Sequence, residues 1–497
     1  MRFCPLCVDP SAASLLYTTA MLRLSMRFFV MLFVMTGLLL PTDLHAQEEA
    51  EHPLAFIMPN PSVLRAAHHK VFAHYFTQFP RSIDNLPPAE DYYASHYLMP
   101  SGEHNKFLHQ GGFMRQRPLQ RAVDTRTDWE QEDLRWEVRT AAAAGIDGFC
   151  LNLLETQGVH WGRAKALLSA ASASPGFSIM LMPDITSAFK TPTEVVDAMV
   201  ELGAFPAALR LADGRLVVAP YCPQVRSTAW WQEVMAECSA RGLRIALFPV
   251  LQSLEQNLDL FSPLSVGLSE WGMRTPATAG GRADFPAQAH RRGLLWMEPV
   301  SPQDMRPKDL FLFEAGNTAL FRTMWMRAID HDADWVQLIT WNDYSEATEI
   351  APSSGTGWMF MDLTAWYTAR FKTGQWPTVV RDVAWLVHRT QRSSLQPTQQ
   401  ERAFTWRDSQ PLDEVEAVLL LKAPAEVRLE SGKTTSTQVL PAGLSRMAVS
   451  LSLGRPHLTV RRNGQTILRG ESAWPVCDTA PYQDPLYRAT AISKVSP

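Results

Sequence analysis

Between residues 70 and 345, short apolar runs alternate with longer amphipathic or loop segments. The runs cover residues 71–75, 146–151, 177–182, 215–219, 244–248, 266–271, 293–298 and 335–341. Their apolar residues are consecutive rather than alternating, which is typical of parallel strands buried on both faces. Eight such strands separated by helical segments predict an α/β fold, a (β/α)8 TIM barrel. An open doubly wound sheet is the alternative, although no glycine-rich phosphate-binding turn follows any run.

The segments between the runs carry helix signals. Residues 127–145 begin with Thr127 and Asp128 as capping residues, continue with acidic residues, and end at Gly145. Residues 191–203 and 228–242 also end on a glycine. We therefore expect helices in these three segments.

After about residue 380 the pattern changes to short alternating runs. Residues 392–400 have the composition of a surface connection, and the Asn463-Gly464 pair between two alternating runs predicts a β-hairpin. We expect a C-terminal antiparallel β-sandwich whose role is to pack against the barrel rather than to bind ligand directly. The predicted plan is an extension with a signal peptide (1–46), a catalytic barrel (65–378), a sandwich (385–475) and a tail (476–497).

The N-terminus resembles a secretory signal. Arg23 and Arg27 precede an apolar run over residues 28–40, and cleavage is expected near Ala46. A membrane anchor is the alternative, but a bilayer requires about 20 apolar residues and this run is shorter. We expect a secreted or periplasmic protein that is not inserted in a membrane after processing.

Composition excludes several classes of function. The 497 residues carry a formal net charge of -4, which gives no support to a nucleic-acid partner. The cysteines show no zinc-ligand spacing, and HExxH, GxSxG and GxxxxGK[ST] motifs are absent from the sequence. We expect a monomer with no cofactor and no metal ion.

Polar and aromatic residues stand at the ends of most of the runs. Catalytic residues of barrel enzymes occupy this position, because the carboxyl ends of parallel strands meet at one face. A site that combines carboxylates, amides and aromatic rings suits a sugar, whose ring has an apolar face and whose hydroxyls need hydrogen bonds. The candidate binding residues are His74, Asn152, Asp184, Glu270, Trp271, Trp341, Asn342 and Tyr344, and Glu298 has the same context.

Asp343 and Glu346 are the candidate catalytic pair, since glycoside hydrolysis needs one protonated and one ionised carboxyl group. Their spacing allows a gap of roughly 6.5–9.5 Å, the range of inverting enzymes. We assign Asp343 as general base and Glu346 as general acid. Alternatively, Asp343 caps the following turn and Glu346 is a solvated loop acid. Glu349 is expected to be structural or to bind substrate.

Two further candidates keep alternative interpretations. Asp184 suits a sugar-hydroxyl ligand and a partner of a neighbouring basic group equally well. His74 is interpreted as a site residue because it stands at a strand end, and a core histidine is the alternative.

Five segments together resemble glycoside hydrolase family 71, whose members are α-1,3-glucanases, or mutanases. They are VFAHY, AAAAGIDGFCLN, MLMPDI, EPVSPQ and VQLITWNDYSEATEI, in the family's order across residues 70–375, and the C-terminal part resembles the family's β-sandwich. The resemblance implies an inverting hydrolase acting on an α-glucan, with Asp343 and Glu346 as its acid–base pair. It also implies that His74 and Asp184 line the donor side of the cleft.

The sequence departs from the family pattern beside the two acids. Ser345 replaces the usual glycine, and residues 347–350 read ATEI. The variant is also similar to barrels that cleave mannosidic bonds, so an endo-acting α-mannosidase is one alternative function. A non-catalytic carbohydrate-binding barrel is another, although both carboxylates are retained.

Overall fold

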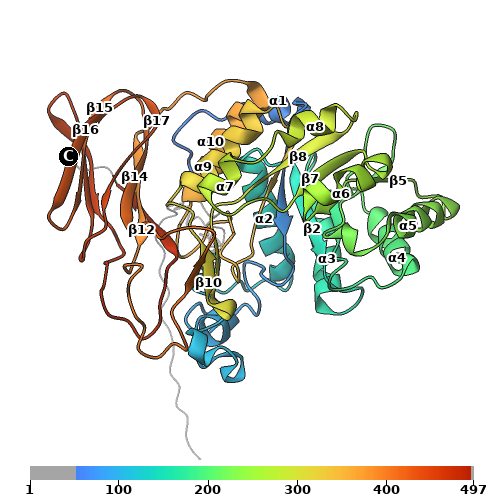
Figure 1. Ribbon diagram of the computed structural model, residues 1–497, viewed down its shortest axis with the longest axis horizontal. Coiled ribbons are helices and arrows are strands. Elements are labelled where there is room, and N and C mark those ends of the chain that lie inside the picture. The colour runs from blue at the N-terminus through green and yellow to red at the C-terminus, as the bar shows by residue number, and fades with distance from the viewer. Residues whose placement is uncertain (1–51, 494–497) are drawn as a thin grey trace, which may run out of the picture. The chain divides into compact units, whose positions relative to one another are not determined.

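A nine-stranded parallel sheet forms the centre of the N-terminal part of the chain (Figure 1). In this computed structural model, which describes residues 52–493, the strand order is β5-β4-β3-β2-β1-β11-β8-β7-β6. Each of the eight predicted runs contains a strand of this sheet, so the predicted parallel α/β architecture is confirmed. The strands are β1 (Lys70–Tyr75), β2 (Gly148–Leu153), β3 (Ser178–Pro183), β4 (Leu216–Val218), β5 (Ile245–Leu247), β6 (Val250–Leu251), β7 (Gly267–Glu270), β8 (Leu295–Val300) and β11 (Trp335–Leu338).

The two end strands of the sheet belong to one continuous segment. β5 and β6 are separated only by Phe248 and Pro249, and Pro249 has no N–H to donate to a ladder. β5 pairs with β4, whereas β6 pairs with β7. The N–H of Val266 donates to Leu247 O (2.9 Å) and that of Ser269 donates to Pro249 O (3.0 Å). The sheet is therefore curled.

Helices cover the outer face of this sheet (Figure 1). The three predicted helices are present as α2, α4 and α5. Thr191 and Glu194 form a capping box at the start of α4, in which the Thr191 hydroxyl accepts from the Glu194 N–H and the Glu194 carboxylate accepts from the Thr191 N–H. The helices are α1 (Pro61–Ala66), α2 (Trp129–Ala143), α3 (Val159–Ser172), α4 (Pro192–Gly203), α5 (Thr228–Ala240), α6 (Leu254–Phe261), α7 (Pro276–Gly280), α8 (Phe285–His290), α9 (Ala319–Asp330) and α10 (Met359–Thr373).

Alternate residues of each strand enter two different apolar clusters. The inner cluster, enclosed by the curled sheet, includes Phe72 and Met297, and the outer cluster, shared with the helices, includes Val71 and Leu268. Successive side chains of a strand point to opposite faces, and both faces are buried here. Consecutive apolar residues are the consequence.

Smaller elements lie in the connections. A three-stranded sheet has the order β13-β10-β9, from β9 (Asp304–Arg306), β10 (Phe311–Phe313) and β13 (Thr405–Arg407). Short helical turns are η1 (Tyr93–Tyr97), η2 (Glu103–Asn105), η3 (Leu108–Gln110), η4 (Pro223–Val225), η5 (Ser262–Leu264) and η6 (Pro307–Asp309).

Two four-stranded antiparallel sheets form the C-terminal part. The first has the order β17-β14-β12-β20 and the second β16-β15-β18-β19, and residues of both contribute to one apolar cluster. Their strands are β12 (Val383–Arg389), β14 (Glu414–Leu421), β15 (Ala425–Ser431), β16 (Thr434–Leu440), β17 (Gly443–Ser450), β18 (His457–Arg462), β19 (Gln465–Glu471) and β20 (Tyr487–Ile492).

Two details of this part bear on the sequence analysis. Asn463 (φ 52°) and Gly464 (φ 78°) connect β18 to β19, so the predicted hairpin is confirmed. β20 pairs with β12 although it lies in the segment predicted as a tail, and the antiparallel structure therefore extends to Ile492.

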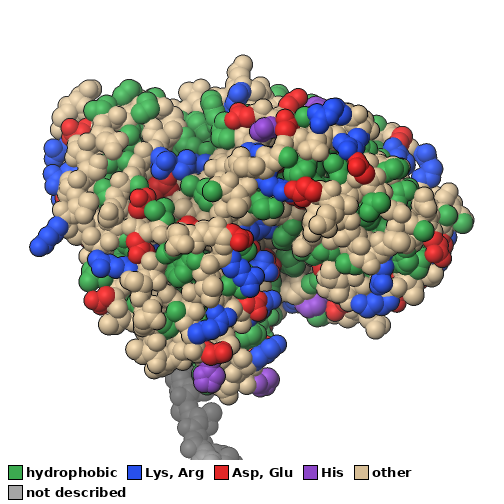
Figure 2. All heavy atoms as spheres, viewed as in Figure 1, with side chains coloured by type: hydrophobic (Ala, Val, Ile, Leu, Met, Phe, Trp, Pro, Cys, Tyr) green, Lys and Arg blue, Asp and Glu red, His purple; other side chains and the backbone are tan. Residues whose placement is uncertain are grey.

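The described residues contain no helix long and apolar enough to cross a membrane. They also contain no group of three or more His, Cys, Asp or Glu residues arranged to hold a metal ion. The predicted signal peptide lies outside the described residues. On the face shown in Figure 2, acidic and basic side chains of the described part are interspersed.

Candidate active site

The loop after β11 carries both candidate catalytic residues and is folded back on itself. The N–H of Thr340 donates to Thr348 O (2.7 Å), and the N–H of Ile350 donates to Thr340 O (2.9 Å). Inside this ring, the N–H of Asp343 donates to the Thr340 hydroxyl (2.7 Å). These hydrogen bonds within the loop help to fix its conformation.

Asp343 is buried, with a side chain that accepts several hydrogen bonds. Its Oδ1 accepts from the Ser345 N–H (3.0 Å), the Ser345 hydroxyl (2.7 Å) and the Glu346 N–H (3.1 Å). Burial raises the pKa of Asp343, whereas these hydrogen bonds and Arg306 lower it. Because Ser345 replaces the glycine of the family pattern, one of the three hydrogen bonds comes from a side chain that glycine lacks.

Glu346 lies next to an arginine and two other carboxylates. Its Oε1 is 2.8 Å from Nη1 of Arg306, and 16% of its side chain is exposed. Burial raises the pKa of Glu346 well above its usual range, and the negative charges of Asp343 and Asp304 raise it further, against the opposing effect of Arg306. Two interacting carboxyl groups of this kind bind and release protons as a pair.

A group of charged residues beside Glu346 was not predicted from the sequence. Arg306 donates from Nε to Asp304 Oδ1 and from Nη2 to Asp304 Oδ2, both at 2.9 Å, and Arg274 donates from Nε to Asp304 Oδ2 (3.2 Å). Asp304 and Arg306 stand only a few residues beyond the end of β8, so inspection of the residues just past each strand would have found them.

Inner-face aromatic residues gather at the carboxyl ends of the strands. The ring of His74 lies 4.8 Å from that of Phe76 and, edge on, 4.8 Å from that of Trp271. Tyr221 lies 4.8 Å from Trp271, and Glu346 and Asp184 both contribute to its raised pKa, after burial. The structure therefore brings His74 and Trp271 together, with Tyr221 as a neighbour that sequence analysis missed.

His74 is neutral in this environment. Its Nδ1 lies 3.3 Å from Nε2 of Gln337, and its Nε2 has no hydrogen-bond partner among the described residues. Complete burial lowers the pKa of His74 to about 3. A neutral imidazole here supplies a hydrogen-bonding nitrogen rather than a charge.

Asn152, on β2, and Asp184, the residue that follows β3, both lie on the inner face. Each follows by two residues an inner-cluster side chain, Cys150 or Met182. Asn152 Oδ1 is buried without a hydrogen-bond partner among residues 52–493. Asp184 Oδ1 accepts from the N–H (2.8 Å) and the hydroxyl (2.6 Å) of Thr186, so this carboxylate also caps the turn after β3.

The structure places Glu270 and Glu298 on the outer face instead. Glu270 forms an ion pair with Arg282, with Nε of Arg282 at 3.2 Å from Oε1. Glu298 Oε1 lies 3.1 Å from Nε of Arg327 on α9. Glu270 follows Leu268 of the outer cluster by two residues, so its side chain points toward the helices and away from the candidate pair.

Three residues of the WNDY segment are also engaged in packing. The ring of Trp341 is fully buried in the outer cluster, 5.0 Å from Phe149. The Asn342 amide donates to Phe76 O (2.8 Å) and Phe79 O (2.9 Å) and accepts from the Phe76 N–H (2.8 Å). Tyr344 packs in a small buried cluster with Phe79. All three side chains are buried, and Asn342 joins the loop after β11 to residues 76–79.

Glu349 follows Glu346 by three residues on the same loop. It is buried and bonded by Gln116, and burial raises its pKa well above the usual range. Its position supports the structural interpretation.

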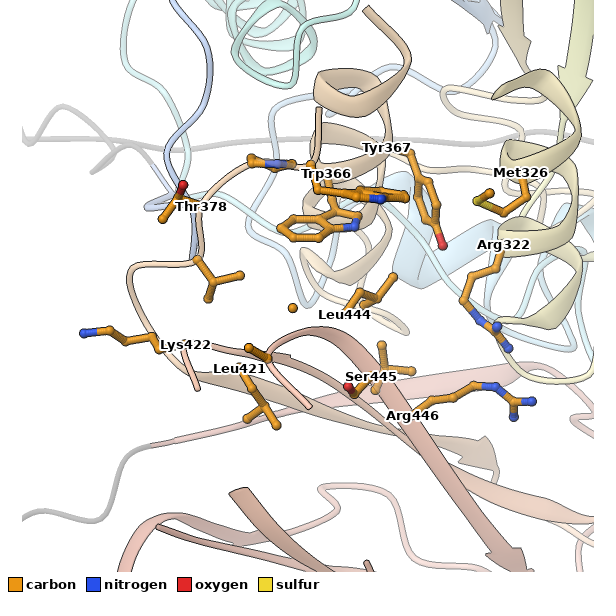
Figure 3. A pocket seen from close by; sticks show the side chains of 16 residues that line it. Arg322, Met326, Trp366, Tyr367, Thr378, Leu421, Lys422, Leu444, Ser445 and Arg446 are labelled. Carbon is orange, nitrogen blue, oxygen red and sulfur yellow. The ribbon is translucent and has the colours of Figure 1, made fainter. Parts of the chain in front are cut away.

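A cavity of about 610 Å³ lies elsewhere in the molecule (Figure 3). Residues of α9 and α10, including Arg322 and Trp366, form one side, and residues of β14 and β17, including Leu421 and Arg446, form the other. None of the candidate site residues lines it.

Comparison with known sequences identifies relatives over most of the chain. The sequence profile of glycosyl hydrolase family 71 matches residues 122–484. A glucan endo-1,3-alpha-glucosidase of Schizosaccharomyces pombe is 24% identical over 372 residues, which cover 70% of this chain and 86% of that protein. A mutanase of Penicillium rubens is 24% identical over 384 residues, covering 71% of this chain and 83% of that protein.

Among solved structures, a GH99 endo-alpha-mannosidase from Bacteroides thetaiotaomicron matches with a TM-score of 0.48 and 16% sequence identity. The match covers 61% of this chain and 97% of that chain.

Proposed function

Since the chain belongs to glycosyl hydrolase family 71 and is a glycoside hydrolase, we propose that it cleaves α-1,3-glucosidic bonds in a polysaccharide. The observation that carries this proposal is the buried pair of Asp343 and Glu346. Both residues lie on one loop that follows the carboxyl end of β11 and contains internal hydrogen bonds. The names of both relatives support the choice of an α-1,3-glucan as substrate.

The proposed mechanism is inverting. Asp343 acts as general base: burial raises its pKa, and the hydrogen bonds from Ser345 and from the Glu346 N–H, together with Arg306, oppose that rise and stabilise the ionised form. Glu346 acts as general acid, because burial and two negative neighbours favour its protonated form. A water molecule activated by Asp343 attacks the anomeric carbon while Glu346 protonates the leaving oxygen.

The inner-face residues are the proposed sugar-binding set. Trp271 offers an indole against which a pyranose ring can stack, and His74, Asn152 and Asp184 offer hydrogen-bonding groups for hydroxyls. The unpartnered atoms His74 Nε2 and Asn152 Oδ1 support this role, because a buried polar atom without a partner is costly unless a ligand or water satisfies it.

The finer architecture and the cellular location belong to the same proposal. We propose a closed (β/α)8 barrel, supported by the hydrogen bond from Val266 to Leu247, and a sandwich of the two antiparallel sheets, supported by their common apolar cluster. The protein is proposed to be a monomer exported after cleavage near Ala46. Sequencing the N-terminus of exported protein tests the cleavage, and retention of residues 28–40 would contradict it.

An endo-acting α-mannosidase remains the second candidate, favoured by the ATEI sequence at residues 347–350. A panel of insoluble and soluble α-glucans and an α-mannan, assayed with the mature protein, separates the two. We expect hydrolysis of α-1,3-glucan. Turnover of α-mannan alone would favour the mannosidase, and no turnover of any glycan would favour a binding protein.

Proton NMR of the first products tests the stereochemistry. Inversion of an α-linked glucan gives β-configured products before mutarotation. An initial α-anomer would mean that the two carboxyl groups work by a retaining mechanism.

A further inference from the structure

The side chain of Arg306 connects two carboxylates. Its Nε and Nη2 bond to the two oxygens of Asp304 at 2.9 Å each, while its Nη1 lies 2.8 Å from Glu346 Oε1. The side chain of Asp304 is completely buried. A guanidinium held by both oxygens of a buried carboxylate has a fixed plane, so its third nitrogen presents Glu346 with a donor in a fixed place.

The backbone and the neighbouring residues reinforce this arrangement. The N–H of Met305, between Asp304 and Arg306, donates to Glu346 O (2.8 Å). Met305 also shares an apolar cluster with Ala347, Phe404 and Leu486. The backbone carbonyl of Glu346 and the next residue, Ala347, are thus both in contact with β9.

Arg306 lies on β9 of the three-stranded sheet, and the third strand of that sheet, β13, comes from the C-terminal part of the chain. β9 pairs with β10, and β10 pairs in parallel with β13, Thr405–Arg407. Residues far apart in the sequence therefore set the position of β9 relative to the loop of Glu346.

We propose that Arg306, anchored by Asp304, is a positioning residue that holds the carboxyl group of Glu346 in the orientation needed to protonate the leaving group. This inference rests on the proposed function of Glu346 as general acid. The proposal also gives the C-terminal part a role, because its strand β13 belongs to the three-stranded sheet that carries Arg306.

The charges around Glu346 determine how the proposal is tested. Asp343 lies on the same loop, Asp304 and Arg306 lie on β9, Arg274 follows β7, and Tyr221 follows β4. The positive charge of Lys308, which follows β9, lowers the pKa of Asp343. Arg306 lowers the pKa of Glu346 and Asp304 raises it. Because the general acid must be protonated, its pKa sets the basic limb of the pH–rate profile.

The experiment measures kcat, KM and the pH–rate profile on the glycan that the wild-type protein hydrolyses best. For Arg306→Met we expect kcat to fall on the order of 10²-fold with little change in KM, because misplaced catalytic groups cost about that much. The basic limb should move to higher pH. For Asp304→Asn it should move to lower pH, because a negative charge near Glu346 is removed.

Two further variants separate positioning from general loss of structure. Arg306→Lys keeps the positive charge, but an ammonium group cannot bond both carboxylates as a planar guanidinium does. The basic limb of its pH–rate profile should therefore stay at the wild-type pH, while its kcat should lie between those of the wild type and Arg306→Met. Arg407→Met is the matched control. Arg407 lies over Phe311 at 3.5 Å in the same small sheet, and its loss should leave kcat and the limb unchanged.

Unchanged kcat in Arg306→Met, or reduced kcat with an unmoved basic limb, would overturn the proposal. If the wild-type protein hydrolyses no glycan, the proposed function fails but the contact can still be tested. The readout is then carbodiimide labelling of Glu346 against pH, mapped by mass spectrometry, since labelling requires a protonated carboxyl. Labelling of Glu346 should extend to higher pH in Arg306→Met, and coincident profiles would refute the electrostatic contact.

Discussion

Carboxylates near the ends of β7 and β8 and those on the loop after β11 have similar sequence contexts, yet they lie in two chemically different regions. Glu270 and Glu298 point outward, where Arg282 and Arg327 neutralise them in the layer beneath the helices. Asp343 and Glu346 lie on a loop beyond the sheet, close to each other and to Asp304. Glu270 and Glu298 each pair directly with a different arginine, although Arg282 also pairs with Glu255, whereas Glu346 shares Arg306 with the buried Asp304 and lies beside Asp343. Burial and the negative charges of Asp343 and Asp304 favour the protonated form of Glu346, which is the form that a general acid needs.

The largest effect is expected from neutralising the candidate pair. Asp343→Asn and Glu346→Gln should each reduce kcat by about 10²–10⁴-fold, the scale of general acid–base catalysis. Thermal unfolding followed by circular dichroism provides the control for folding. Wild-type turnover in either variant would place the acid–base pair elsewhere, and Asp184 would be the next residue to test.

For the outward-facing carboxylates we expect a loss of stability without a loss of activity. Glu298→Gln leaves Arg327 buried without its charged partner, which should lower the free energy of unfolding by about 3–5 kcal/mol. Turnover per folded molecule should stay at the wild-type level. Denaturant unfolding together with activity below the transition measures both quantities. A specific loss of kcat without loss of stability would show that the two regions are not separate.

A smaller difference is expected between two tryptophans. Trp271, on the inner face, should contribute stacking to a sugar, so Trp271→Phe should raise KM by up to about tenfold, equivalent to roughly 0.5–1.5 kcal/mol of aromatic contact. Trp341→Phe should instead lower the melting temperature, because its ring is fully buried in the outer cluster. An unchanged KM in Trp271→Phe would exclude stacking at this position.

The smallest effect concerns the residue between the two acids. The Ser345 hydroxyl helps to lower the pKa of Asp343, so Ser345→Ala should raise that pKa. Because the general base must be ionised, the acidic limb of the pH–rate profile should move to higher pH while the basic limb stays in place. A shift of the basic limb alone would indicate that Asp343 and Glu346 have exchanged roles.

The amino-acid sequence by itself determined those features whose signals are local. The parallel strands follow from consecutive apolar runs, helices such as α4 from their caps, and the β18–β19 hairpin from Asn463-Gly464. Asp343 and Glu346 could also be identified, because they follow an apolar run within one short segment, and several of the hydrogen bonds of their loop join residues 340–350 to one another.

Only the tertiary structure decided which strand-end residues share the candidate site. Strands buried on both faces have apolar residues at most positions, so their sequence carries no regular alternation that marks the inner face. Glu270 and Trp271 are adjacent in sequence, yet the first joins Arg282 on the outside and the second joins His74 on the inside. Arg306 shows the same limit over a longer range. Its contact with Glu346 depends on a small sheet completed by residues 405–407, and a pairing between segments so far apart leaves no local pattern in either of them.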